Sequence, residues 1–160
     1  MKELTLEMAL KMIEAASRWA RDVAGFPCSI AVVDRSGGLL AVHRMDGAAM
    51  ATTDVAIEKA YTAVAWGMPT MLGARWIDPR NVGKHIGDHA FGMFGRGKGR
   101  LCLIPGGIPV TDEEGEVIGG IGTSGVPAGL GDINDTAVSQ AGIVALYEEG
   151  DDLRGGEEGP

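Results

Sequence analysis

Apolar residues recur at every third or fourth position near the start of the chain. Between Thr5 and Ala24 they stand at Leu6, Leu10, Ile13, Ala16, Ala20 and Val23. This spacing is typical of one face of an α-helix, so the segment is predicted to form an amphipathic helix that buries this face. Gly25 and Pro27 are predicted to end the helix.

Two short apolar runs follow this helix. They cover Cys28–Asp34 and Leu39–Met45, and the sequence RSGG separates them. Glycines in that position allow the positive φ angles of a tight turn, so the two runs are predicted to form a β-hairpin. The first run is apolar at successive positions, which favours a central strand of a sheet.

The second helix is predicted from Thr52 or Thr53 to Trp66, with Thr53 as its N-cap. Small residues share one face of this helix, which lets a helix lie close to a sheet. They are Ala56, Ala60, Ala63 and Gly67. A short helix is predicted for Thr70–Ile77, closed by Asp78 and Pro79.

Glycine is frequent in the stretch from Arg80 to Gly99, which favours a structured loop over a long regular helix. A second β region follows this loop. Its predicted strands are Arg100–Ile104, Ile108–Val110 and Val117–Ser124. The last helix is predicted to begin near Asp132, as its N-cap, and to end at about Tyr147.

This order of elements predicts an α+β fold in which helices pack on an antiparallel sheet of about five strands. The 160 residues fit one domain, predicted over residues 1–147. Acidic residues dominate from Glu148 to Pro160, so residues 148–160 are predicted to be a disordered tail.

Composition and charge exclude several classes of protein. Hydrophobic residues make up 45% of the chain and charged residues 22%, as in a globular domain. The net charge of −8 argues against a nucleic-acid partner, although the basic segment from Arg75 to Arg100 is suited to one small anion. No apolar run reaches the length of a membrane span and the N-terminus does not resemble a signal peptide, so we expect a cytoplasmic protein without a membrane partner.

Three blocks of sequence resemble the GlcG/HbpS family, a haem-degrading-type domain that is also similar to the C-terminal domain of PduO proteins. The blocks are AVVDRSGGLLAVHRMDGA from Ala31, TTDVAIEKAYTAVAWGMPT from Thr52, and PGGIPV with GEVIGGIGTSG between Pro105 and Gly125. The resemblance implies a profilin-like or roadblock-like arrangement, a homo-oligomer, and the binding of haem or another small molecule.

His85 and His89 form the sharpest local motif, because two imidazoles four residues apart on a helix can bind one metal ion. Either residue is also a candidate general acid or base. Under the family resemblance, one of the two would ligate haem iron. The structural alternative is a pair of loop histidines that bond to the backbone or to water.

Other candidate ligand-binding residues are charged groups and backbone turns. Arg75 and Arg100 would bind haem propionates or another anion, or else lie on a solvated surface. Gly106 and Gly107, after Pro105, would form either a pocket wall or a plain turn. Thr123 offers a hydroxyl to a ligand, and Lys59 is either a pocket cation or a surface charge.

Two further patterns favour a structural interpretation. Gly120, Gly122 and Gly125 spell a dinucleotide fingerprint, but no helix opens directly after them, so they are predicted to serve close packing. Cys28 and Cys102 lie inside predicted strands and are predicted to be buried, inert thiols.

Three functions remain open at this stage. The first is a small-ligand binding protein with haem or another tetrapyrrole as its ligand. The second is a catabolic enzyme that acts on a small carboxylated or phosphorylated molecule, with His85 or His89 as acid or base and arginines as anion anchors. The third is an oligomeric scaffold without a ligand. The apolar residues between Trp66 and Trp76 are predicted to form a subunit contact in the homo-oligomer.

Overall fold

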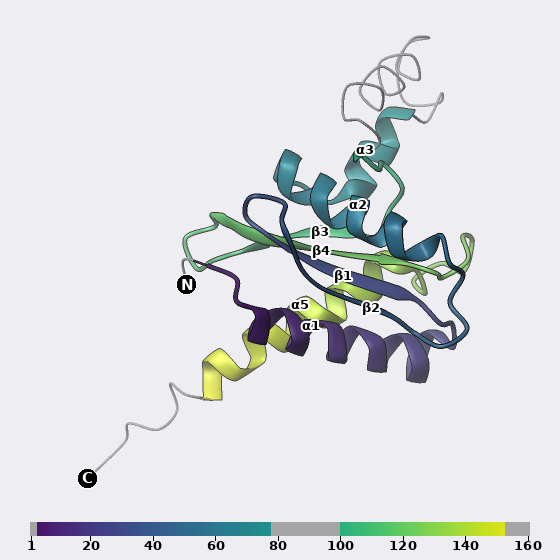
Figure 1. The fold of residues 1–160 in the computed structure, drawn as a ribbon, viewed down its shortest axis with the longest axis horizontal. Coiled ribbons are helices and arrows are strands. Elements are labelled where there is room, and N and C mark those ends of the chain that lie inside the picture. The colour runs from purple at the N-terminus through teal and green to yellow at the C-terminus, as the bar shows by residue number, and fades with distance from the viewer. Residues whose placement is uncertain (1–2, 78–99, 153–160) are drawn as a thin grey trace.

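A four-stranded antiparallel sheet lies between two layers of helices in this computed structural model, which describes residues 3–77 and 100–152 (Figure 1). The strands follow the order β2-β1-β4-β3. Helix α2 covers one face of the sheet, while α1 and α5 cover the other face (Figure 1). The predicted α+β class is therefore confirmed, with four strands where about five were predicted. None of the helices in these two ranges is long and apolar enough to cross a bilayer.

The first helix, α1 (Leu6–Trp19), continues into one π-helical turn at Ala20–Ala24. Thr5 caps it, because its hydroxyl accepts a hydrogen bond from the Met8 amide at 3.3 Å. Gly25 ends the turn with φ 73°, and the N–H of this glycine donates to the carbonyl of Ala20, five residues earlier.

The buried face of the first helix agrees with the predicted one at Ile13, Ala16 and Ala20, and differs at Leu6, Leu10 and Val23. The side chains of Ala9, Met12, Ile13, Ala16 and Ala20 are buried, whereas Leu6, Leu10 and Val23 are 53%, 42% and 54% exposed. Small side chains let the helix pack closely against the core, so the face that carries the alanines is buried and the face that carries the longer leucines is exposed. The π turn then rotates Val23 off the buried stripe, because it closes over five residues instead of four.

The predicted hairpin is present as β1 (Ser29–Asp34) and β2 (Leu39–Arg44). The turn is held by Asp34, whose Oδ1 accepts bonds from the amides of Ser36 and Gly38 at 2.7 and 2.9 Å. Strand β1 is central, as predicted, and pairs with both β2 and β4. Its residues from Ser29 to Val33 are fully buried.

The other two strands are β3 (Gly107–Thr111) and β4 (Val117–Ser124). The strand predicted at Arg100–Ile104 is wrong, because these residues make no ladder with the sheet. Their backbone groups bond to threonine side chains instead. The Cys102 amide donates to Thr62 Oγ1 at 2.8 Å, and the Ile104 carbonyl accepts from Thr70 Oγ1 at 2.9 Å.

The remaining helices are α2 (Thr52–Trp66), α3 (Thr70–Ile77) and α5 (Asp135–Asp152). Two predicted caps are wrong. Helix α2 has no side-chain cap, since the hydroxyls of its first two residues bond to Ser29 Oγ. Helix α5 is capped by Asn134, not Asp132, through a bond from the Ala137 amide at 2.9 Å, and it continues past Tyr147 to Asp152.

Helix α2 lies directly on glycines of the sheet, as its small-residue face predicts. A Cβ atom on Gly122 of β4 would lie 2.2 Å from the carbonyl oxygen of Ala56 and 2.5 Å from the amide nitrogen of Ala60. A Cβ on Gly120 would lie 2.7 Å from the Ala60 carbonyl oxygen. The fingerprint-like glycines therefore serve close backbone packing.

Replacing Gly122 with alanine should destabilise the fold, because the new methyl group would meet the helix backbone, which cannot move aside as a side chain can. We expect Gly122→Ala to lower the free energy of unfolding by about 3 kcal/mol in urea titrations. Gly115→Asn is the matched control, since Gly115 has φ 85° with open space around it and asparagine tolerates that conformation. Equal stabilities for the two variants would contradict the packing argument.

Candidate functional site

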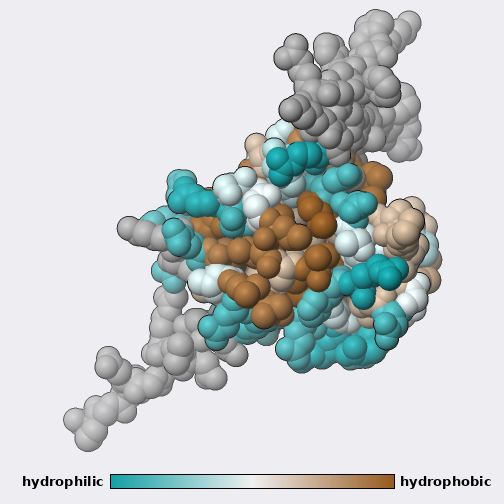
Figure 2. Space-filling view, in the orientation of Figure 1, coloured by the Kyte–Doolittle hydropathy of each residue, from teal (hydrophilic) through white to brown (hydrophobic). Residues whose placement is uncertain are grey.

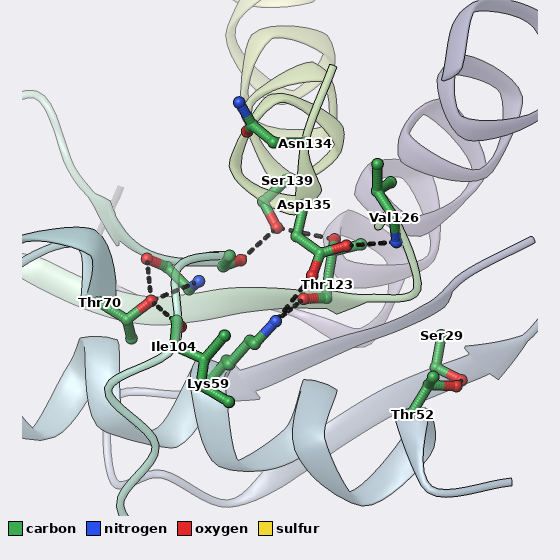
Figure 3. Close-up of polar contacts among 12 residues, drawn as sticks. Ser29, Thr52, Lys59, Thr70, Ile104, Thr123, Val126, Asn134, Asp135 and Ser139 are labelled. Carbon is green, nitrogen blue, oxygen red and sulfur yellow. Dashed lines mark hydrogen bonds and ion pairs between the residues drawn. The ribbon is translucent and has the colours of Figure 1, made fainter. Parts of the chain in front are cut away.

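A buried lysine lies at the centre of a polar cluster between α2, β4 and α5. The side chain of Lys59 is only 1% exposed, and its Nζ lies 2.8 Å from Asp135 Oδ2 and 2.9 Å from the Thr123 carbonyl oxygen (Figure 3). An ammonium group removed from water is stable only when it is paired and hydrogen-bonded. These two contacts supply that compensation.

Asp135 connects this lysine to two further parts of the chain. It is the first residue of α5, where the positive end of the helix dipole favours a carboxylate. Its second oxygen, Oδ1, accepts a hydrogen bond from the Val126 amide at 2.9 Å (Figure 3). The ion pair thus fixes the start of α5 and the loop that follows β4 against α2.

Hydroxyl groups continue the cluster toward β3. Ser139 Oγ donates to the Gly106 carbonyl at 2.7 Å and lies 2.8 Å from Thr123 Oγ1. Gly106 has φ 134°, and a Cβ there would lie 2.5 Å from the Thr123 carbonyl oxygen and 3.0 Å from Lys59 Nζ. This position therefore requires glycine.

Thr70, the first residue of α3, bonds to the segment that leads into β3. Its Oγ1 donates to the Ile104 carbonyl and accepts from the Gly107 amide, each at 2.9 Å (Figure 3). Helix α3 leads into residues 78–99 and residues 100–104 return from them. Thr70 therefore ties the start of α3 to the segment that leads into β3.

A pocket of about 390 Å³ opens beside the cluster. Its walls are mainly apolar and come from α3, the approach to β3 and the loop after β4. They include Met71, Ile104, Pro105, Val126, Pro127 and Ala128. Asn134, Asp135 and Thr136 form the polar side. Because Lys59 balances the charge of Asp135, the pocket offers apolar surface with a few polar groups, which is the usual lining of a small-molecule site.

A larger groove of about 600 Å³ lies between α1 and α5, on the opposite side of the sheet. Alanines line much of it, together with Trp19, Val23 and Val144. It has no buried charged group at its base, so we place the candidate site at the smaller pocket.

The structure brings four of the predicted ligand-binding residues together, namely Lys59, Gly106, Gly107 and Thr123. Within the described residues they bond mainly to one another and to neighbouring elements. The ammonium of Lys59 is taken up by Asp135, and the hydroxyl of Thr123 is bonded to Ser139. These residues therefore lie behind the pocket lining and are linked to it through Asp135, which lines the pocket.

Of the other predicted site residues, only the side chain of Arg100 lies in the described part of the chain, and its printed contact is outside this cluster. Arg100 stacks over the ring of Tyr61, with its guanidinium carbon 3.8 Å from the ring centre. Arg75 lies in α3 but its side chain is outside the described part, as are His85 and His89. Among residues that the structure describes, no three His, Cys, Asp or Glu side chains are grouped to hold a metal ion.

Sequence reasoning missed Asp135, Ser139 and Thr70. A signal for Asp135 was available, because Lys59 lies between Ala56, Ala60 and Ala63 on the face predicted to approach the sheet. A lysine in that position has to find a carboxylate. The acidic residues near the start of the last helix were the available partners on a neighbouring element.

The two cysteines are free, buried thiols, as predicted, although neither lies inside a strand. Burial raises the pKa of Cys28 to about 12, with a smaller contribution from the negative charge of Asp135. Burial also raises the pKa of Cys102. Both groups therefore remain protonated and unreactive in the folded protein at neutral pH.

The fold and the pocket together define a class: an α+β domain with one four-stranded sheet and a small-molecule-sized pocket. A family model described as "Haem degrading protein HbpS-like" matches residues 4–144. The chain therefore belongs to the HbpS-like family.

Individual relatives agree with this assignment. The chain is 32% identical over 122 residues to an uncharacterized 15.0 kDa protein in the dhaT-dhaS intergenic region of Citrobacter freundii, which covers 76% of this chain and 80% of that protein. A double mutant of Streptomyces reticuli HbpS is 35% identical, with a TM-score of 0.73 over 91% of this chain and 88% of that one. Klebsiella pneumoniae ORFY is 26% identical, with a TM-score of 0.77 over 92% and 93%.

The haem complex of PduOC shares the fold, with a TM-score of 0.72 at 24% identity over 89% of this chain and 94% of that one.

Breaking the buried ion pair should cost far more than breaking an exposed one. Lys59→Met leaves a carboxylate without its partner, so we expect a loss of about 3 kcal/mol in the free energy of unfolding. The double variant Lys59→Met/Asp135→Asn should lose less than the sum of the single variants. The control is Arg18→Met, which removes an exposed pair with Glu14 at 3.4 Å and should change stability by less than about 1 kcal/mol. Additive costs would contradict the pairing.

The cysteines predict a loss of stability at high pH. The unfolded chain ionises Cys28 near its ordinary pKa of 9.0, whereas the folded chain ionises it only near 12. The folded state binds more protons in this interval, so the free energy of unfolding should fall as the pH rises above about 9. In Cys28→Ala this fall should be smaller, and an unchanged slope would contradict the assignment. A thiol reagent should label neither cysteine before unfolding.

Proposed function

We propose that this protein binds a small apolar ligand in the pocket beside Lys59 and Asp135, and that the ligand is haem or another tetrapyrrole. The observation that carries the proposal is an apolar pocket whose walls include Met71 of α3 and Ile104. These residues belong to the two segments that precede and follow residues 78–99, the stretch that contains His85 and His89. Membership of a family described as haem degrading and HbpS-like supports the choice of ligand.

The lining residues fit one face of a porphyrin. Apolar contacts come from Ile104, Pro105, Val126 and Pro127. Met71, which is 40% exposed, adds a polarisable thioether. Among the described residues, the lining contains no arginine or lysine. The propionates therefore need cations from outside it, a role that we propose for Arg75.

The iron ligand in this proposal is His85 or His89, because imidazole is a common axial ligand of haem. Bound haem iron would supply redox and ligand-exchange chemistry. The chain's own contribution in the described part is to exclude water from one face of the ligand and to hold the start of α3 against the segment that leads into β3. Thr70 performs the second task through Ile104 and Gly107.

We also propose that the protein is a homo-oligomer. Within the predicted contact segment, Met71 and Leu72 are 40% and 37% exposed. Side chains of this size at the surface of α3 are typical of a region that another chain covers.

A hemin titration tests the ligand. We expect a shift of the Soret band for the protein as it stands, and loss of the shift in the double variant His85→Ala/His89→Ala. Ile104→Asp places a charge in the pocket wall at a residue that is 56% exposed, so it should weaken binding at least about tenfold without unfolding the protein. Leu10→Asp is the control, since Leu10 is 42% exposed on α1 and should bind hemin normally. No shift in any variant would overturn haem as the ligand, and equal affinities of the two aspartate variants would overturn the pocket.

A further inference from the structure

The two edge strands of the sheet differ in whether their outward backbone groups have hydrogen-bond partners within the described part of the chain. The order β2-β1-β4-β3 leaves β2 and β3 with one neighbour each. An open strand edge exposes a row of backbone donors and acceptors that can pair with another strand. The question for each edge is where its outward backbone groups find partners.

At the β3 edge, one backbone group at each of three outward positions is bonded or lacks a donor. The Thr123 amide on β4 donates toward β3, to Gly106, and the alternation along the paired strands then directs Gly107, Pro109 and Thr111 outward. The Gly107 amide donates to Thr70 Oγ1, Pro109 has no N–H to donate, and the Thr111 carbonyl accepts from the hydroxyl of Tyr147. These three positions interrupt the row of donors and acceptors that an added strand would need.

At the β2 edge, the outward groups have no such closure among the described residues. The Met45 amide donates to the Cys28 carbonyl at 3.0 Å, so it points toward β1. The same alternation directs the backbone groups of Val42 and Arg44 away from β1, into the space beside the sheet. No strand in residues 3–77 or 100–152 pairs with that side of β2.

The surface around this edge is apolar. Figure 2 shows hydrophobic residues gathered between α2 and α1, where β2 runs in Figure 1. Leu39 is 49% exposed, and Leu40, Ala41 and Val42 are partly buried. A strand with this composition and an open edge is suited to a buried interface rather than to contact with water.

We infer that β2 pairs with β2 of a second copy of this chain, antiparallel and about a two-fold axis, to form one continuous eight-stranded sheet. The inference refines the proposed homo-oligomer and does not depend on the ligand. Outward groups have to face outward groups, which sets Val42 opposite Val42 of the second copy.

Charge favours this antiparallel arrangement over a parallel one. Arg44 is the last residue of β2, and the turn that precedes β2 carries both Asp34 and Arg35. Antiparallel pairing brings Arg44 of each copy toward the turn of the other. Parallel pairing would instead place the two arginines side by side.

Analytical ultracentrifugation of Val42→Pro tests the inference. Proline removes an N–H that points away from β1, so the sheet of one chain keeps its bonds, as β3 does with Pro109. We expect the protein as it stands to sediment at an even multiple of 16.6 kDa and the variant at half that mass or less, with hemin binding retained. A single-chain mass for the unchanged protein overturns both the oligomer and the edge. An unchanged mass for folded Val42→Pro overturns the edge alone.

A pair of cysteine variants decides the question even if the proline variant does not fold. Val42→Cys places two thiols on opposed residues about 5.5 Å apart between Cα atoms, within the range of a disulfide. In Arg44→Cys the two thiols lie four residues apart along the paired strands, too far to join. We expect mild oxidation to give a covalent dimer of Val42→Cys only, because the native cysteines are buried. Equal cross-linking of the two variants, or none of Val42→Cys, overturns the register.

Discussion

The burial of one ammonium group places strict demands on the rest of this fold. Lys59 is on the face of α2 that lies against the sheet, so its charge has to be balanced inside the protein. Asp135 provides the balance, and Thr123 contributes a carbonyl oxygen. Removing both charges in favour of apolar groups is often neutral in other proteins, so the value of such a pair lies as much in specifying one arrangement as in stability. Here it specifies where α5 begins.

The ion pair is possible only because α2 lies unusually close to the strands. Gly120 and Gly122 of β4, and Gly107 of β3, present backbone instead of side chains to the helix. With ordinary side chains at these positions the helix would stand further from the sheet, and Lys59 Nζ would no longer reach the Thr123 carbonyl. The high glycine content of the chain is therefore partly explained by this single helix–sheet contact.

The sequence predicted the helices and strands better than it predicted the hydrogen-bond and ion-pair partners of individual residues. The hairpin, α2, α3 and β4 follow from local periodicity and from turn residues, so they appear where they were expected. The strand predicted at Arg100–Ile104 is absent because its backbone bonds to Thr62 and Thr70, which local patterns cannot reveal. Asp135 was missed for the same reason, since it meets Lys59 across 76 positions. His85 and His89 stay predictions.

Hydrogen bonds to threonine hydroxyls take the place of the strand that was predicted at Arg100–Ile104. The packing of this part of the domain therefore does not depend on the length of the segment that precedes it. Thr62 and Thr70 anchor residues 102–107 to α2 and α3 through hydroxyl groups. The bonds that hold residues 102–107 are made to α2 and α3, so they do not involve the number of residues that join Ile77 to Arg100. Evolution could vary the chemistry beside the pocket while the scaffold beneath it stays the same.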